Sequence, residues 1–160
     1  ELLGGARSVL DISSATLADA FLAARVLCYA QGFRILGAAS EEYGWQLDFA
    51  RIAEIWRAGC IIRSALLDDI SEAFRGQLPH EQLILAPAFT KVLTGCIPAL
   101  RQVVDGGHAV PALSAAIQWY DTMRQGYGTA NIIQAQRDFF GHHGFERLGR
   151  EGRHHGPWWD

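Results

Sequence analysis

Lysine is almost absent from this sequence of 160 residues: of its fourteen basic residues only Lys91 is a lysine, and the others are arginines. The formal net charge is −3. This balance argues against an extended nucleic-acid interface, which requires a surplus of basic side chains. Arginine favours bidentate binding of phosphate or carboxylate, but a GC-rich genome produces the same bias, and we give that explanation most of the weight.

Cysteine is scarce, and long apolar runs are lacking. Cys28, Cys60 and Cys96 are odd in number and far apart, so they form neither a disulfide framework nor a metal-binding spacing. A reducing, cytoplasmic location follows. No apolar stretch approaches the roughly 18 residues of a membrane helix, and the N-terminus lacks the pattern of a signal peptide. The sequence therefore predicts no membrane insertion.

Methionine is found only at position 123, and the chain begins with Glu1. We therefore expect the chain to be an excised piece of a longer protein.

Hydrophobic residues make up 49% of the sequence. A globular chain of this length can enclose one domain with its own core.

Helical periodicity runs through most of the chain. Apolar residues recur at steps of three to five over 17–43, which predicts one long helix that ends at Gly44. Asp19 would complete a capping box behind Thr16. The candidate caps at the start of this helix are Ser13, Ser14 and Thr16.

Shorter helices are predicted downstream, and no strand alternation is convincing. Their expected ranges are 49–57 (capped by Asp48), about 60–74, a short helix after Pro79, 86–104 (split at Pro98), a helix from Pro111, and 130–140 (stopped by Gly141). Residues 144–160 have four glycines and no sustained period. Because Trp158 and Trp159 need burial, this tail is expected to pack on another subunit. The predicted fold is all-α: a long helix plus a bundle of shorter helices, with an extended C-terminal tail.

Residues 129–143, TANIIQAQRDFFGHH, gather polar groups that a plain core helix does not need. Arg137 would lie in the last turns of a helix and His143 just past its end. An arginine fork and a histidine donor together can bind an anion. Alternatively, Arg137 faces the helix C-terminus or a surface acid, and His143 is a surface residue. The residue chemistry leaves both interpretations open.

Other chemical sites find little support in the sequence. Four of the six histidines lie in the last nineteen residues, but adjacent histidines do not easily bind one ion, so no metal site is predicted. Asp68 and Asp69 are expected on an exposed helix face, and Ser64 and Ser114 lack a partner at a known spacing. No glycine-rich phosphate loop follows a strand. We therefore predict no catalytic and no cofactor-binding residue in this chain.

Five long stretches of the sequence form specific motifs: YAQGF at 29–33, EIWRAGCIIRS at 54–64, VPALSAAIQWYDTMR at 110–124, ANIIQAQRDFFGHH at 130–143 and the ending EGRHHGPWWD. Over roughly residues 11–160 these motifs resemble the decarboxylating 6-phosphogluconate dehydrogenases. The sequence departs from the family pattern at Ala58, where glycine is usual, at His142, where alanine is usual, and at Gly144, where threonine is common.

This resemblance implies an oxidoreductase that converts 6-phosphogluconate and NADP to ribulose 5-phosphate, CO2 and NADPH. In the family, a Rossmann domain binds the cofactor, and the catalytic lysine and glutamate lie in the first half of the helical domain. All three would lie outside this chain. Residues 1–143 would be the second half of that helical domain, and residues 144–160 a tail that packs on a partner subunit.

The resemblance also implies roles for two residues. Arg137 and His143 match the family residues that bind the substrate phosphate in the active site of the partner subunit of a homodimer. The chain alone is expected to be inactive. Two alternatives stay open: a purely structural dimerisation module, and the same domain of a related hydroxyacid dehydrogenase.

Overall fold

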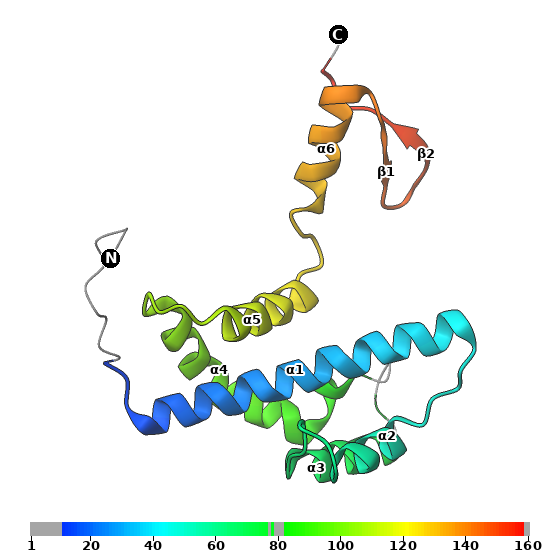
Figure 1. Ribbon diagram of the computed structural model, residues 1–160. Helices are drawn as coiled ribbons and strands as arrows, with labels where there is room; N and C mark the ends of the chain where they lie inside the picture. Colours follow the sequence, from blue (N-terminus) through cyan, green and yellow to red (C-terminus); the bar gives the residue numbers. More distant parts are fainter. Residues whose placement is uncertain (1–10, 77, 79–81, 159–160) are drawn as a thin grey trace. The chain divides into compact units, whose positions relative to one another are not determined.

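The computed structural model describes residues 11–76, 78 and 82–158, and the chain divides into two compact units between Tyr120 and Asp121. The predicted, mainly helical fold with one long helix is confirmed (Figure 1). None of the helices among the described residues has the length and apolar character needed to span a bilayer. The elements are α1 (Ser14–Tyr43), α2 (Phe49–Trp56), α3 (Leu66–Arg75), the 3-10 turn η2 (Leu83–Leu85), α4 (Pro87–Asp105), α5 (Pro111–Arg124), α6 (Ala130–Gly141), β1 (Phe145–Arg147) and β2 (Arg150–His154).

Helix α1 begins at a serine cap and ends at a glycine. The Ser13 hydroxyl accepts the N–H of Thr16 at 3.0 Å, which satisfies one of the free donors of the first turn. The predicted capping box between Thr16 and Asp19 is wrong, because the helix begins at Ser14 and not at Leu17, where a helix capped by Thr16 would begin. Gly44 takes a left-handed conformation with φ of 65°, so the predicted stop at this residue is confirmed.

The core of the first unit forms where α1 packs along α4, with α2, α3 and η2 against them (Figure 1). Small residues on α1 allow this approach, and Ala20 and Ala23 are fully buried. Phe33 of α1 then meets Phe49 and Phe74, with ring centroids 6.1 and 4.8 Å away. One apolar face of α1 thus holds the unit together.

The prediction that Pro98 divides the helix over 86–104 is wrong, because α4 runs unbroken through Pro98. Proline inside a helix removes a hydrogen bond and costs about 3 kcal/mol or more. Leu93 and Leu100, on either side of Pro98, are buried in the core, and burying a leucine contributes about 1.5–3 kcal/mol. Tertiary packing on both sides of Pro98 therefore outweighs the local penalty.

The predicted helix start near Cys60 is also wrong, since α3 begins at Leu66. The intervening residues form a loop that α1 holds: the Tyr29 hydroxyl donates to the Ile62 carbonyl. The Ser64 hydroxyl accepts the N–H of Leu66 at 3.2 Å. These contacts satisfy backbone groups outside a helix, so the apolar periodicity of this segment does not lead to helical structure.

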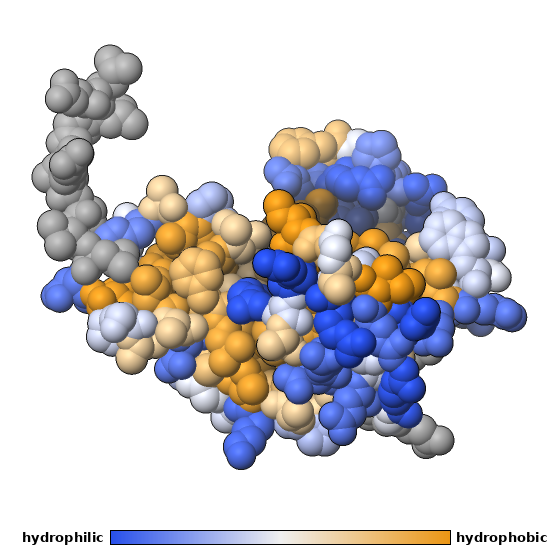
Figure 2. All heavy atoms as spheres, turned by 60° about the horizontal axis from the view of Figure 1, so that its bottom comes forward, coloured by the Kyte–Doolittle hydropathy of each residue, from blue (hydrophilic) through white to orange (hydrophobic). Residues whose placement is uncertain are grey.

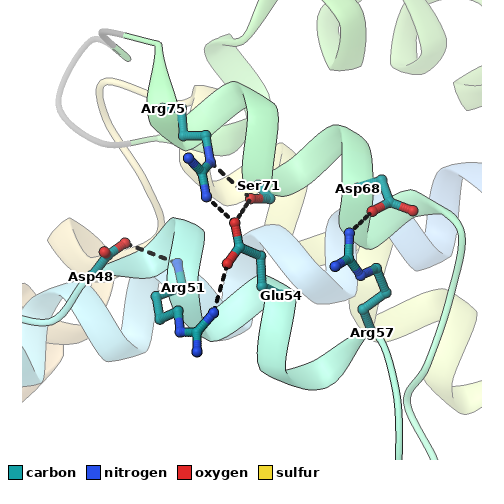
Figure 3. Close-up of polar contacts among 7 residues, drawn as sticks. All are labelled: Asp48, Arg51, Glu54, Arg57, Asp68, Ser71 and Arg75. Carbon is teal, nitrogen blue, oxygen red and sulfur yellow. Dashed lines mark hydrogen bonds and ion pairs between the residues drawn. The ribbon is translucent and has the colours of Figure 1, made fainter.

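Two acidic residues near α2 behave as the sequence predicts. Asp48 caps the helix, and its Oδ1 accepts the N–H of Arg51 at 2.9 Å. Asp68 lies on an exposed face of α3, where it pairs with Arg57 at 2.5 Å (Figure 3). Such an exposed ion pair contributes little to stability.

A denser network around Glu54 joins α2 to α3 (Figure 3). Glu54 accepts hydrogen bonds from the guanidinium groups of Arg75 and Arg51, the second at 3.1 Å. The Ser71 hydroxyl donates to the same carboxylate at 3.2 Å. The bonds from Arg75 and Arg51 lower the pKa of Glu54 below its ordinary value of 4.5. The folded chain therefore favours the ionised form of Glu54.

Replacing Glu54 with glutamine is expected to lower the melting temperature at pH 7 by a few degrees. A depressed pKa stabilises the fold above pH 4.5, and this contribution is lost as the pH falls through the pKa of the folded state. The difference in melting temperature between wild type and Glu54→Gln should therefore shrink from pH 6 to pH 3. Thermal melts across this range, with Glu72→Gln on the exposed face of α3 as control, measure it. An equal difference at every pH would contradict the assignment.

Large apolar side chains also reach the surface of the first unit. Figure 2 shows hydrophobic residues lying among hydrophilic ones on one face of the molecule. Ile61 is fully exposed, and Ile35 is 63% exposed. Other exposed apolar residues of this unit are Phe21, Tyr43, Trp45, Ile55, Ile62 and Leu85. Exposure on this scale is typical of a surface that packs on another part of a protein.

The second unit contains a small antiparallel hairpin that the sequence did not predict within the tail 144–160. Strands β1 and β2 pair with Phe145 opposite His154, and the chain turns at Leu148 and Gly149. Gly149 has a φ of 72°, a conformation that glycine adopts without strain. Strand β1 is too short to show the alternation of apolar and polar residues that indicates a strand. The sequence therefore predicted only an extended tail.

Candidate functional site

The candidate site lies at the C-terminal end of α6 and in the segment that follows it. The C-cap of the helix is His142, which has a φ of 50° and donates its N–H to the carbonyl of Asp138 at 2.8 Å. Histidine is less common than glycine in this conformation. The helix thus extends one residue beyond the predicted range 130–140, and Gly141 is its last residue rather than its stop.

Arg137 lies on the exposed surface of α6, in the last turns of the helix as predicted. Its Nη1 donates to Oε1 of Gln134 at 2.9 Å. This i,i+3 contact orients the side chain. The other donors of the guanidinium stay available for a ligand, because no ion pair to Arg137 is found among the described residues.

His143 is also exposed and lies just past the end of the helix. Its ring folds back over Gly141, where an added Cβ would lie 2.6 Å from His143 Nε2. The carbonyl of His143 accepts a hydrogen bond from Arg153 on β2. In the part of the chain that the structure describes, no hydrogen bond joins His143 to Arg137.

Between Arg137 and His143 in the sequence lies Asp138, a residue of the site that the sequence analysis did not identify. Its side chain is fully buried. Oδ1 accepts the N–H of Gly144 at 2.8 Å and contacts Nδ1 of His155 at 2.6 Å. Oδ2 accepts the N–H of Gly156 and Nε1–H of Trp158, both at 2.8 Å. We call these five residues the Asp138 cluster.

Burial by itself would raise the pKa of Asp138, because it penalises the charged form. The hydrogen bonds from Gly156, His155, Gly144 and Trp158 act in the opposite direction, and the net result is a pKa held far below the ordinary value of 3.8. Asp138 is therefore a buried carboxylate that stays ionised.

The tail residues also stack on one another. The rings of His142 and His155 lie 3.8 Å apart with planes 8° from parallel, and Trp158 packs edge-on against Phe139 at 5.9 Å. Part of Trp158 is thus buried within its own unit. Trp159 lies outside the described residues.

Asp138, His142 and His155 are the described residues whose potential ligand atoms come close enough to hold a metal ion, within 4.8 Å of one another. However, N–H donors already occupy both oxygens of Asp138. A metal ion would have to displace these bonds, and stacked imidazole rings do not direct two lone pairs at one point. This geometry favours a hydrogen-bond cluster over a metal site.

Sequence comparison identifies the family. Residues 7–158 match the family described as "6-phosphogluconate dehydrogenase, C-terminal domain". The chain belongs to this family. The resemblance in the QAQRD and tail motifs is therefore confirmed, and Arg137, His143 and the Asp138 cluster lie in the matched part of a 6-phosphogluconate dehydrogenase domain.

Relatives of known function agree with this assignment. A decarboxylating 6-phosphogluconate dehydrogenase of Escherichia coli (strain K12) is 45% identical over 140 residues, which are 85% of this chain and 30% of that protein. The NADP(+)-dependent decarboxylating enzyme of Bacillus subtilis (strain 168) is 43% identical over 143 residues, 87% of this chain and 30% of that protein. The chain thus spans about 30% of the length of these curated relatives.

A solved structure shows the same fold. Plasmodium falciparum 6-phosphogluconate dehydrogenase, described in its apo form and in complex with its cofactor NADP+ and its substrate 6-phosphogluconate, matches with a TM-score of 0.87 and 32% identity. The match covers 98% of this chain and 36% of that one.

Proposed function

We propose that this chain is the C-terminal part of a decarboxylating 6-phosphogluconate dehydrogenase. The complete enzyme would oxidise 6-phosphogluconate with NADP and release CO2, leaving ribulose 5-phosphate. The observation that carries the proposal is the family match over residues 7–158, together with relatives that perform this reaction. A cytoplasmic location, as the scattered cysteines suggest, is part of the same proposal.

Within that enzyme, we propose that Arg137 and His143 bind the phosphate of the substrate. Both side chains are exposed, and Gln134 orients the guanidinium while leaving most of its donors available. The phosphate is remote from the reacting carbons, so its binding energy can position C3 and the departing carboxylate. Two charge-assisted bonds of roughly 1.5–3 kcal/mol each would supply much of that energy.

The catalytic lysine and glutamate and the NADP-binding Rossmann domain would come from the preceding part of the enzyme. This chain covers only about 30% of its relatives, which is consistent with that division. The chain would then contribute substrate binding and dimerisation.

We further propose that the second unit packs on a partner subunit of a homodimer. Its described surface carries several exposed apolar side chains: Tyr127 (78%), Ile132 (72%), Ile133 (53%), Phe140 (74%) and Leu148 (85%). Apolar groups exposed at this density typically become buried at an interface. Arg137 and His143, on the same unit, would then complete the active site of the partner.

The test compares two proteins for NADPH formation from 6-phosphogluconate. One is the 160-residue chain, which should show no turnover because it lacks the reacting groups. The other is the complete enzyme: this chain behind its own upstream part, or behind that of the Escherichia coli relative as a hybrid. The complete enzyme should produce NADPH and CO2 in equal amounts.

Two results would contradict the proposal. Turnover by the chain alone would place reacting groups within it. A folded, dimeric complete enzyme that is inactive on 6-phosphogluconate would favour one of the two alternatives, a structural module or a related hydroxyacid dehydrogenase. Assays with other phosphorylated sugar acids separate those two.

A further inference from the structure

We propose that Asp138 is a positioning residue for the phosphate site, whose carboxylate fixes His143 and the C-terminal tail beside Arg137. This inference rests on the proposed function and adds to it the group that shapes the site. Asp138 directly follows Arg137 on α6, but its side chain is fully buried whereas that of Arg137 is exposed. The same short segment thus provides both a ligand-binding group and an internal anchor.

The first step of the argument concerns the peptide group between His143 and Gly144. Its N–H donates to Asp138 Oδ1 at 2.8 Å, and its carbonyl accepts from Arg153. Both ends of one peptide plane are therefore held, one by α6 and the other by β2. Since this plane is attached directly to the Cα of His143, its orientation determines where the imidazole can reach.

The second step is that helix formation does not explain an acid at this position. A carboxylate in the last turn of a helix faces the negative end of the helix dipole, which is unfavourable. Burial adds a further cost for the charged group. The negative charge of Asp138 is compensated by N–H donors from residues that follow the helix. Asp138 therefore stabilises the tail and not the helix.

The third step is the close approach of the backbone. Gly144 is buried and has a φ of 69°, and an added Cβ would lie 2.5 Å from the Arg153 side chain. An added Cβ at Gly156 would overlap the Trp158 ring. Only glycine at these two positions lets the chain wrap this tightly around Asp138. The tail geometry is thus built around one carboxylate.

Asparagine cannot replace this carboxylate, although it has nearly the same shape. Each oxygen of Asp138 accepts at least one backbone N–H, from Gly144 on Oδ1 and from Gly156 on Oδ2. An asparagine has only one oxygen, so either orientation of its amide turns an NH2 group toward one of those donors. Asp138→Asn therefore removes the anchoring with a minimal change of volume.

The experiment measures steady-state kinetics of the complete enzyme for wild type, Asp138→Asn and Arg137→Ala. Asp138→Asn should raise KM for 6-phosphogluconate about tenfold, the effect of misplacing roughly one charge-assisted bond. The kcat and the KM for NADP should change less than about twofold. A group that merely stabilises the fold would not produce this separation.

Two further variants make the result decisive. Asp48→Asn is the matched control, because it removes a carboxylate that also binds a backbone N–H, but in the other unit; it should leave all KM values unchanged. Trp158→Phe removes only one donor to Asp138 Oδ2 and preserves most of the ring. It should raise the KM for 6-phosphogluconate about two- to threefold, and it decides the question if Asp138→Asn does not fold.

The outcomes separate this inference from the function on which it rests. If Arg137→Ala raises KM but Asp138→Asn and Trp158→Phe do not, the positioning role is wrong and the phosphate site stands. If Arg137→Ala leaves KM unchanged, the phosphate site itself is wrong, and the role of Asp138 falls with it. A parallel rise in the KM for NADP would identify a general loss of structure and would also overturn the inference.

Discussion

Replacing Arg137 with alanine is expected to raise the KM of the complete enzyme for 6-phosphogluconate by about 10- to 150-fold. This range corresponds to the loss of one charge-assisted hydrogen bond of about 1.5–3 kcal/mol. The KM for NADP should not change, because the cofactor would be bound by another domain. Steady-state kinetics with each substrate varied in turn measure both values. An unchanged KM for 6-phosphogluconate would remove Arg137 from the site.

The nature of the contact can be tested with lysine at the same position. Arg137→Lys keeps the charge but loses the planar guanidinium group and its contact to Gln134. Its KM should lie between those of wild type and Arg137→Ala. Arg150→Ala, on the exposed hairpin of the same unit, is the matched control for removing a surface arginine, and it should behave as wild type.

Replacing Leu27 with alanine is expected to destabilise the 160-residue chain by about 2–5 kcal/mol. Leu27 is fully buried in the middle of α1. Its removal takes apolar area out of the core and leaves a cavity between tightly packed helices, which relax only partly. Urea unfolding at a fixed protein concentration, followed by circular dichroism, measures the free energy of unfolding.

A substitution at an exposed position of the same helix isolates the effect of burial. Ile35 of α1 is 63% exposed, and Ile35→Ala should change the free energy of unfolding by about 0.5 kcal/mol or less. Similar losses for Leu27→Ala and Ile35→Ala would mean that the exposed face of α1 is covered in solution. Such a result would favour a dimer that involves this helix.

Local signals account for the features that the sequence predicted well. The stop of the long helix depends on Gly44, whose left-handed conformation is a property of that one residue. The cap of α2 depends on Asp48 and a backbone N–H three residues later. The proposal for Arg137 and His143 likewise depends on the long family motif that surrounds them. In each case the information lies within one short stretch of chain.

The wrong predictions involve residues whose partners lie elsewhere in the chain. Pro98 should end a helix on local grounds, but packing of its flanking leucines against α1 keeps α4 continuous. Cys60 should lie in a helix by periodicity, but Tyr29 holds the neighbouring loop in another conformation. Contacts over such separations overcome local preferences of a few kcal/mol.

Asp138 shows most clearly the difference between what the local sequence determines and what only tertiary contacts determine. The sequence places an acid directly after Arg137 and supplies the glycines, histidine and tryptophan of the tail, and its motifs define the family. The partners of the carboxylate, however, lie up to 20 residues further along the chain, and no periodicity or spacing connects them. The burial of this charge, and with it the path of the tail, arises only when α6 and the hairpin pack together, because a buried carboxylate is stable only where several donors converge on it.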